Sequence, residues 1–311
     1  MIGRAEIEAA RRRIAGRVRR TPVLSLPEGA LARLPGALSF KLENCQITGS
    51  FKPRGVFNRV LSEPSLPRSG LIAASGGNHA LAVAFAARAL RLPCEVFLPS
   101  IAPAIKREQL RSLGAKVTVV GDVFAEALEA SDARAQDTGA LSVHAFDHPA
   151  VVAGQGTLAA ELEDQVPDLD TVLVAVGGGG LIGGIAAWYA GRVRVVAVEP
   201  EGSPSLARAR EEGCPVDIQT GGLAADSLGC RRVGELGFGL AQRFVEQALV
   251  VNEEAIRRAQ SLLWEEIRII AEPGGAVALA ALLDGSYAPA RGERVGVIVC
   301  GGNTDPAALL T

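Results

Sequence analysis

Short runs of apolar, mostly β-branched residues alternate along this chain with segments long enough to form helices. These runs are LIAAS (71–75), CEVFLP (94–99), AKVTVVG (115–121), TVLVAV (171–176), VRVVAVEP (193–200) and RVGVIVC (294–300). Strands that are apolar along their whole length and are separated by helices are typical of parallel sheets covered on both faces. The sequence therefore predicts an α/β fold.

Three of these strands end on glycine, at ASGGNH (74–79), AVGGGGLIGG (175–184) and VCGGNTD (299–305). In open parallel sheets, ligands bind at the carboxyl ends of the strands. Glycine at that edge permits positive φ and lets a ligand approach the backbone closely. Three such turns in one chain indicate a single site that is assembled from distant segments.

Composition argues against several classes of function. The 311 residues carry a net charge of −2 and 4% aromatic residues, so they show no electrostatic footprint for nucleic acid. No apolar run reaches the roughly 20 residues of a membrane span, and the charged N-terminal segment reads as an amphipathic helix rather than a signal peptide. The five cysteines are dispersed without a C-x-x-C pair, which is typical of reduced thiols. We expect a cytoplasmic protein without nucleic-acid or membrane partners.

One lysine stands in an unusual place. The chain has four lysines against 28 arginines, and Lys52 lies between a phenylalanine and a proline in GSFKPRG (49–55). The ordinary reading of such a residue is a solvated charge in a loop. Its significance depends on what else the site contains.

The glycine run VGGGGLIGG (176–184) follows a predicted buried strand and precedes a predicted helix. Consecutive backbone N–H groups at a helix N-terminus favour a phosphate dianion. The run is not a P-loop, because no G-K-[ST] follows. Glu199 lies 19 residues beyond Gly180, so spacing alone leaves a dinucleotide site open. A tight strand–helix junction without a ligand is an equally good interpretation of this run alone.

A lysine amine together with a phosphate cradle is what pyridoxal phosphate requires, because the amine binds the cofactor aldehyde and the cradle holds its phosphate. Asn78, at the end of a strand, could donate to the ring hydroxyl. Cys300, at the end of the last strand, could face the pyridine nitrogen.

Six motifs in order resemble those of the fold-type II pyridoxal-phosphate enzymes, in the serine/threonine dehydratase and serine racemase branch. They are KLENCQITGSFKPRG, SGGNH, VAGQGT, VGGGGLIGG, EPGGA and VCGGNTD, and the resemblance covers about residues 20–306. The resemblance implies two open, mostly parallel twisted sheets covered by helices, as in the tryptophan synthase β-subunit. It also implies a homodimer.

Within that fold, a small domain is expected to be inserted in a large one. We predict a large cofactor-binding domain over 1–38 and 145–311, and a small substrate-side domain over 39–144 that carries Lys52. The chain ends soon after VCGGNTD, so we expect no C-terminal regulatory domain of the kind found in biosynthetic threonine deaminases.

The resemblance also implies a role for each matched residue. Lys52 would bind the cofactor and then remove the substrate Cα proton. Phe51 would lie near the cofactor ring. Asn78 would hold the 3-hydroxyl group of the ring, and Cys300 would face the ring nitrogen. The phosphate would be bound by Gly177, Gly178, Gly179, Gly180 and the amide of Leu181. The substrate carboxylate would be held by the loop of Ser75, Gly76, Gly77, Asn78 and His79, in which His79 more naturally packs beside the cofactor than acts as an acid or base. His144 reads as structural.

The predicted reaction is α,β-elimination. A neutral thiol at Cys300 would leave the ring a weaker electron sink than a carboxylate would, which suits loss of a β-hydroxyl group. We therefore predict a pyridoxal-phosphate-dependent ammonia-lyase that converts L-serine or L-threonine to an oxo acid and ammonia. Gly76 departs from racemase-like members, which carry a serine there as the second acid/base.

Other departures leave alternatives open. Glu199 matches the first ligand of the divalent-cation site in related enzymes, but Ser205 stands where an acidic residue is expected. We therefore predict no set of metal ligands. Whether a monovalent or a divalent cation activates the enzyme is left open. Asp226 and Glu272 match acidic family positions, as caps or as catalytic groups. Leu81 replaces a common glutamine. The alternatives are a racemase, a dehydratase of a modified substrate such as 3-hydroxyaspartate or a hydroxyectoine-derived amino acid, and a non-enzymatic phosphate-binding protein.

Overall fold

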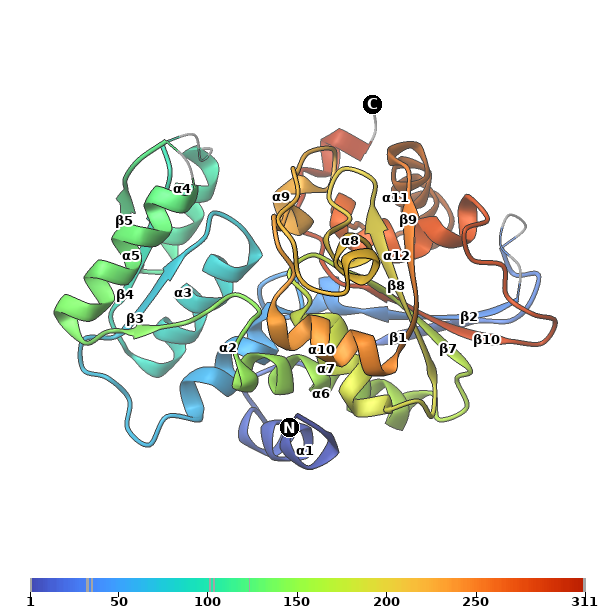
Figure 1. Cartoon of the computed structure of the whole chain (residues 1–311), viewed down its shortest axis with the longest axis horizontal. Helices are drawn as coiled ribbons and strands as arrows, with labels where there is room; N and C mark the ends of the chain where they lie inside the picture. The colour runs from blue at the N-terminus through green and yellow to red at the C-terminus, as the bar shows by residue number, and fades with distance from the viewer. Residues whose placement is uncertain are drawn as a thin grey trace.

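The computed structural model describes residues 2–31, 34, 36–100, 102, 104–122 and 124–309. Two open sheets form the framework, and each is flanked by helices, as Figure 1 shows. The α/β architecture predicted from the alternating runs is confirmed. Within the described residues no helix is both long and apolar enough to cross a membrane.

The larger sheet has six strands in the order β1-β2-β10-β7-β8-β9. Its strands are β1 (Val23–Leu26), β2 (Ala37–Leu42), β7 (Thr171–Ala175), β8 (Arg194–Pro200), β9 (Val245–Val251) and β10 (Arg294–Val299). All neighbours are parallel except β1, which pairs antiparallel with β2 at one edge. The central strands β7, β8 and β10 are almost wholly buried, as their apolar runs predict.

Helices cover both faces of this sheet (Figure 1). On one face α12 packs across the central strands with α11 behind it, and on the other face α7 packs on the sheet with α6, α10 and α1 outside it. The helices that belong to this part are α1 (Arg4–Arg13), α6 (Pro149–Gln165), α7 (Gly180–Tyr189), α8 (Ser205–Glu212), α9 (Ala225–Leu228), α10 (Glu235–Phe244), α11 (Glu253–Ile267) and α12 (Pro273–Leu283), with the 3-10 turns η1 (Glu43–Cys45) and η2 (Pro306–Leu309).

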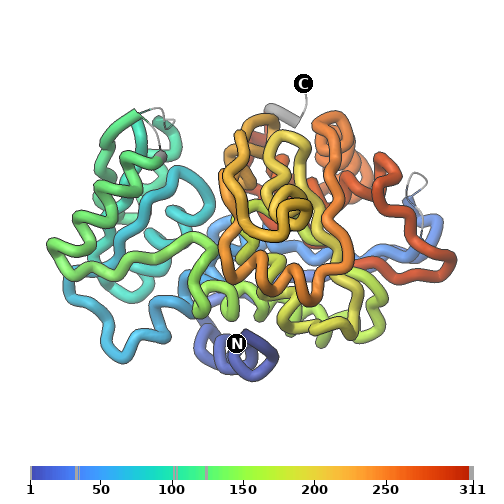
Figure 2. The backbone as a smooth tube through the Cα atoms, in the orientation of Figure 1, coloured from blue at the N-terminus to red at the C-terminus, as the bar shows by residue number. Residues whose placement is uncertain are grey.

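The smaller sheet is fully parallel, in the order β5-β4-β3-β6. Its strands are β3 (Leu71–Ala74), β4 (Cys94–Leu98), β5 (Lys116–Val119) and β6 (Leu141–Ser142), and its helices are α3 (Asn78–Leu90), α4 (Ala104–Ser112) and α5 (Phe124–Thr138). It forms the separate lobe at the left of Figure 2, with its own hydrophobic core. The two expected domain boundaries stay a prediction; the first falls inside β2, which pairs in the larger sheet.

Helix α2 (Lys52–Leu61) joins the two parts, because it packs on α6 of the larger part and on α3 of the smaller one. Glycines set the distance between α2 and α6. A Cβ built on Gly154 of α6 would lie 2.6 Å from the carbonyl oxygen of Arg54, and one on Gly55 of α2 would lie 2.9 Å from Cγ1 of Val151.

The opposite side of α6 meets α7 in the same manner. A Cβ on Gly156 would lie 2.8 Å from the carbonyl oxygen of Gly184, and one on Gly184 would lie 2.5 Å from the amide nitrogen of Gly156. Gly154 and Gly156 are two residues apart in a helix, so a rotation of about 200° around the helix axis separates them and they lie on nearly opposite sides. Helix α6 therefore holds α2 against one side and α7 against the other.

This packing predicts a specific sensitivity to substitution. Gly184→Ala places a methyl group against the backbone of α6, so we expect the free energy of unfolding to fall by about 1–3 kcal/mol, as for other overpacked cores. Urea denaturation measures the change. Gly239→Ala is the matched control: it lies in α10 with nothing within 4 Å of its built Cβ, and alanine there should be neutral or stabilise by up to about 1 kcal/mol. Equal effects from the two variants would contradict the packing argument.

Candidate active site

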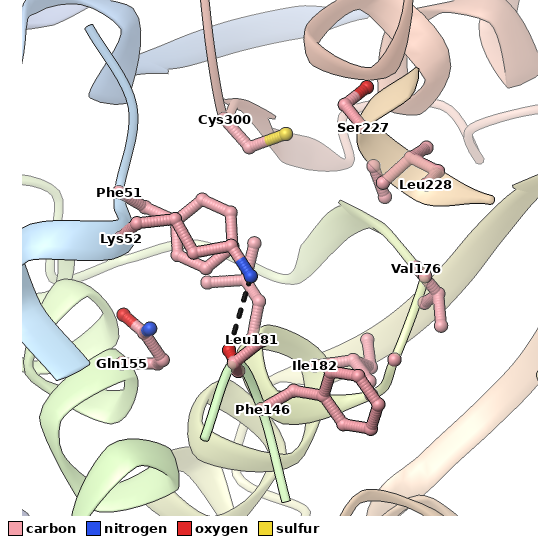
Figure 3. Close-up of a pocket in the computed structure, with 16 residues that line it drawn as sticks. Phe51, Lys52, Phe146, Gln155, Val176, Leu181, Ile182, Ser227, Leu228 and Cys300 are labelled. Atoms are coloured by element: carbon pink, nitrogen blue, oxygen red, sulfur yellow. Dashed lines mark hydrogen bonds between the residues drawn. The ribbon is translucent and has the colours of Figure 1, made fainter. Parts of the chain in front are cut away.

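Lys52 opens helix α2 and points its amine into a pocket at the carboxyl ends of β7 and β10 (Figure 3). The pocket is lined by Phe51, Lys52, Ala145, Phe146, Gln155, Ala175, Val176, Gly177, Gly178, Gly179, Gly180, Leu181, Ile182, Ser227, Leu228 and Cys300. Lys52 Nζ donates to the carbonyl oxygen of Ala145 at 3.2 Å. Burial lowers the pKa of this amine, although Cys230, Cys300 and Glu272 oppose the shift. Lys52 is therefore a partly buried amine in a pocket, and the reading as a solvated loop charge is wrong.

The glycine run lies across the pocket from Lys52 and carries free hydrogen-bond donors. Within the described part of the chain, no backbone N–H from Gly177 through Ile182 donates to a protein acceptor. Gly179 has φ +87°, in the left-handed region, and is the N-cap of α7. A Cβ on Gly178 would lie 2.3 Å from the ring of Phe146, so a side chain there would displace the run. Six unpaired donors at a helix N-terminus form a site for a dianion such as phosphate.

Cys300 and Phe51 complete this pocket, and the backbone ties them together. The Phe51 amide donates to the carbonyl oxygen of Cys300 at 3.1 Å, and Ser50 forms a β-bridge with Gly301. The Cys300 thiol is 4% exposed and donates to the carbonyl oxygen of Gly274 at 3.4 Å. Burial raises the pKa of this thiol, with Glu272 adding to the shift, so the sulfur is neutral at ordinary pH.

Asn78 begins α3 and takes part in a hydrogen-bond chain beside the pocket. Its Nδ2 donates to Glu272 Oε1 at 2.6 Å, and its Oδ1 accepts from Asn303 Nδ2 at 2.7 Å. Glu272 is 5% exposed, and burial raises its pKa to about 7. Asn78, Gly76 and Gly77 line a second, neighbouring cavity rather than the Lys52 pocket itself. The Ser75 hydroxyl accepts from the Gly77 amide at 3.3 Å.

Neither of the two histidines near the site is placed as an acid or base. His79 Nε2 lies 2.7 Å from the carbonyl oxygen of Val143, so this nitrogen carries the proton. Burial and the nearby Lys52 charge lower the pKa of His79 to about 3, which keeps the ring neutral. His144 Nδ1 accepts from the amides of Phe146 and Asp147, at 3.3 and 2.9 Å. It therefore orders the loop that carries Ala145.

The Glu199 carboxylate caps a helix. Its oxygens accept from the amides of Leu206 at 2.8 Å and Ala207 at 2.7 Å, in the first turn of α8. The Ser205 hydroxyl donates to the carbonyl oxygen of Gly177 at 3.1 Å, which ties α8 to the glycine run. Asp226, by contrast, is exposed and forms an ion pair with Lys106.

Several pocket residues were assigned no role from the sequence. Gln155 was quoted within VAGQGT, and its buried Oε1 has no partner among the described residues. Phe146 lines the pocket from a loop, and Ser227 and Leu228 line it from the short helix α9. Ser227 and Leu228 follow Asp226 directly, whereas no sequence signal distinguishes Phe146.

Comparison with known proteins now decides the family. Residues 14–301 match the family described as pyridoxal-phosphate dependent enzyme. This chain belongs to that family. An L-threonine ammonia-lyase of Thermotoga maritima is 37% identical over 311 residues, covering 98% of this chain and 76% of that protein. The structure of maize serine racemase has a TM-score of 0.92 at 32% identity, covering 99% of this chain and 95% of that one. The structure of a serine racemase from Dictyostelium discoideum has a TM-score of 0.89 at 32% identity, covering 98% and 99%.

These matches confirm the resemblance and the fold type, and they make pyridoxal phosphate the cofactor of this enzyme. The alternative of a non-enzymatic phosphate-binding protein is thereby set aside. The residues present fit the cofactor, because six unpaired N–H groups offer a cradle for its phosphate and the Lys52 amine lies in the same pocket. Phe51 and Cys300 supply an aromatic wall and a neutral thiol in the same pocket.

A buried charged network anchors the helix that carries Lys52. Arg54, 1% exposed, donates through Nε and Nη2 to both oxygens of Glu43, at 2.8 and 2.7 Å, and through Nη1 to Glu161 Oε2 at 3.2 Å. Lys41 Nζ donates to Glu161 Oε1 at 2.6 Å. Burial alone would raise the pKa of Glu161, but the charges of Arg54 and Lys41 bring it below its ordinary value. Two cations and two anions thus connect β2, η1, α2 and α6.

Removal of one member should leave uncompensated charge in the interior. We expect Arg54→Met to lower the free energy of unfolding by about 3–5 kcal/mol, because two buried glutamates would share only Lys41. Chemical denaturation followed by circular dichroism measures this loss. Arg208→Met removes a cation from an exposed pair with Glu211 and should produce no measurable change. A stability loss as small for Arg54→Met as for this control would contradict the anchoring role.

Proposed function

We propose that this enzyme is an ammonia-lyase that removes the β-hydroxyl group and the amino group of a β-hydroxy amino acid, with L-serine and L-threonine as the first candidates. The observation that carries the proposal is the composition of one pocket: a lysine amine with a lowered pKa, six free backbone N–H groups and a neutral buried thiol. Similarity to a Thermotoga maritima protein named L-threonine ammonia-lyase supports the same reaction.

Each residue has an assigned task in this proposal. The backbone amides of Gly177, Gly178, Gly179, Gly180 and Leu181 bind the cofactor phosphate, and Phe51 flanks the ring. Asn78 has one Nδ2 hydrogen left after its bond to Glu272, and we assign it to the ring hydroxyl. Ser75, with the amides of Gly76 and Gly77, binds the substrate carboxylate, while His79 supports the loop from behind through its bond to Val143.

When bound, pyridoxal phosphate supplies the electron sink that allows a bond at the substrate Cα to break. The Lys52 amine takes the Cα proton, and its lowered pKa leaves a lone pair available for this step. The β-hydroxyl group leaves with a proton as water. Hydrolysis of the released unsaturated amine then gives the oxo acid and ammonia, so one water is lost and one is consumed.

The Cys300 thiol favours this outcome over reactions that accumulate charge in the ring. A group with a raised pKa stays neutral and does not hold a proton on the pyridine nitrogen. Charge that develops at Cα is therefore better relieved by expelling the β-substituent. We also propose a cytoplasmic location, because all five cysteines are unpaired, and a homodimer, from the family resemblance.

The role of Lys52 is tested by spectroscopy and by product formation. Purified enzyme with pyridoxal phosphate should show a visible absorbance band that Lys52→Ala lacks, and oxo acid release from L-serine or L-threonine should fall about 10³-fold or more. Lys116→Ala, at an exposed lysine paired with Glu95, is the matched control and should keep both properties. A band without oxo acid from either amino acid would contradict the assignment of L-serine or L-threonine as the substrate.

Racemisation provides a separate test, because it requires a second acid/base on the face opposite Lys52. Gly76 offers no side chain for that purpose, and the proposal assigns the Ser75 hydroxyl to the substrate carboxylate. We therefore expect oxo acid to form at least about 100-fold faster than D-serine. Chiral chromatography of the recovered serine measures D-serine, and the oxo acid is assayed in the same reaction. Comparable rates of the two reactions would instead favour the racemase alternative, which the likeness to maize serine racemase supports.

A further inference from the structure

A second cavity of about 540 Å³ adjoins the Lys52 pocket and is lined by three residues of the predicted carboxylate loop. Gly76, Gly77 and Asn78 form one end of this chamber. Asp226 lines it next to Ser227 of the Lys52 pocket, and Gly302 lines it two residues beyond Cys300. A substrate with its carboxylate on the loop and its Cα at Lys52 therefore has the chamber beside its β-carbon.

On the smaller part, three apolar side chains line the chamber beside the polar side chains of Asn78, Lys106 and Gln109. Leu81 lies one turn beyond Asn78 on the same side of α3, and Ile105 and Leu110 face the chamber from α4. Leu110 is buried, but Ile105 is 61% exposed, which makes it the most exposed large apolar side chain among the described residues. Covering such a side chain with an apolar group of a ligand is favourable, in proportion to the area removed from water.

The charges of the chamber disfavour an anionic side chain. Lys106 is the one cation among the described lining residues, and it forms an ion pair with Asp226 across the chamber. Asp305 adds a second carboxylate to the lining. A substrate carboxylate beyond the one held by the loop would thus meet two acidic groups and a cation that is already paired.

We propose that this chamber selects β-hydroxy amino acids whose β-substituent is apolar and larger than a methyl group, namely an aryl or branched alkyl group. This inference rests on the proposed function, because it places the substrate with its Cα at Lys52. Among the substrates considered from the sequence, it favours L-threonine over L-serine and rejects 3-hydroxyaspartate.

Binding of amino acids that cannot undergo elimination tests the chamber independently of the reaction. L-Phenylalanine, L-alanine and L-aspartate lack a β-hydroxyl group, and their dissociation constants for the holoenzyme are obtained from the change in cofactor absorbance. We expect phenylalanine to bind about tenfold or more tightly than alanine, and aspartate to bind no more tightly than alanine. Leu81→Gln and Ile105→Ser should each reduce the ratio of alanine to phenylalanine dissociation constants by about threefold or more.

Leu128→Gln is the matched control, since it changes a 39% exposed leucine on α5 outside the chamber and should leave this ratio unchanged. Equal affinities for phenylalanine and alanine, or tighter binding of aspartate, would overturn the proposal. Oxo acid release from L-threonine and L-threo-phenylserine is then assayed separately. Preference for phenylalanine without any oxo acid would keep the chamber and refute the lyase, whereas oxo acid without that preference would do the reverse.

Discussion

The contact of α6 with α2 on one side and with α7 on the other is the constraint on which the site depends. Lys52 begins α2, and the phosphate-cradle glycines lead into α7, so the two halves of the site meet through α6. Gly154 and Gly156 let both helices approach its backbone to distances that any side chain would increase. The separation of amine and cradle is thereby fixed by backbone packing, which leaves little freedom for the cofactor to be held in any other way.

Buried ion pairs and hydrogen bonds also hold α2 and the site residues in place. The Arg54, Glu43, Glu161 and Lys41 network holds α2 against α6 and β2, and its buried charges balance. The hydrogen bond from Phe51 to Cys300 joins the start of α2 to the carboxyl end of β10. The hydrogen bond from Asn78 to Glu272 joins α3 of the smaller part to the start of α12. The site accordingly depends on contacts between segments that are far apart in the sequence, such as Asn78 and Glu272, which are 194 residues apart.

The sequence alone predicted the fold class well, because the central strands are buried on both faces and read as continuous apolar runs. It missed four strands. They are β1 and β2 of the larger sheet, β9, whose seven residues are buried only at their two ends, and β6, which has two residues. Lys52, Cys300 and the glycine run were predicted by chemistry and resemblance together, and the structure brings them into one pocket. The pairing of Lys41 with Glu161 and the orientation of Asn78 by Glu272 could not be predicted, since they depend on tertiary contacts.

The proposed roles require that Lys52 carries the cofactor, and the other lysines of the sequence are Lys41, Lys106 and Lys116. Holoenzyme treated with borohydride, digested and analysed by peptide mass spectrometry would show the lysine to which the cofactor becomes permanently attached. We predict that the peptide containing Lys52, and no other peptide, carries the added mass of the pyridoxyl group. Attachment at any of the other three lysines, or no attachment at all in a protein with bound cofactor, would contradict it.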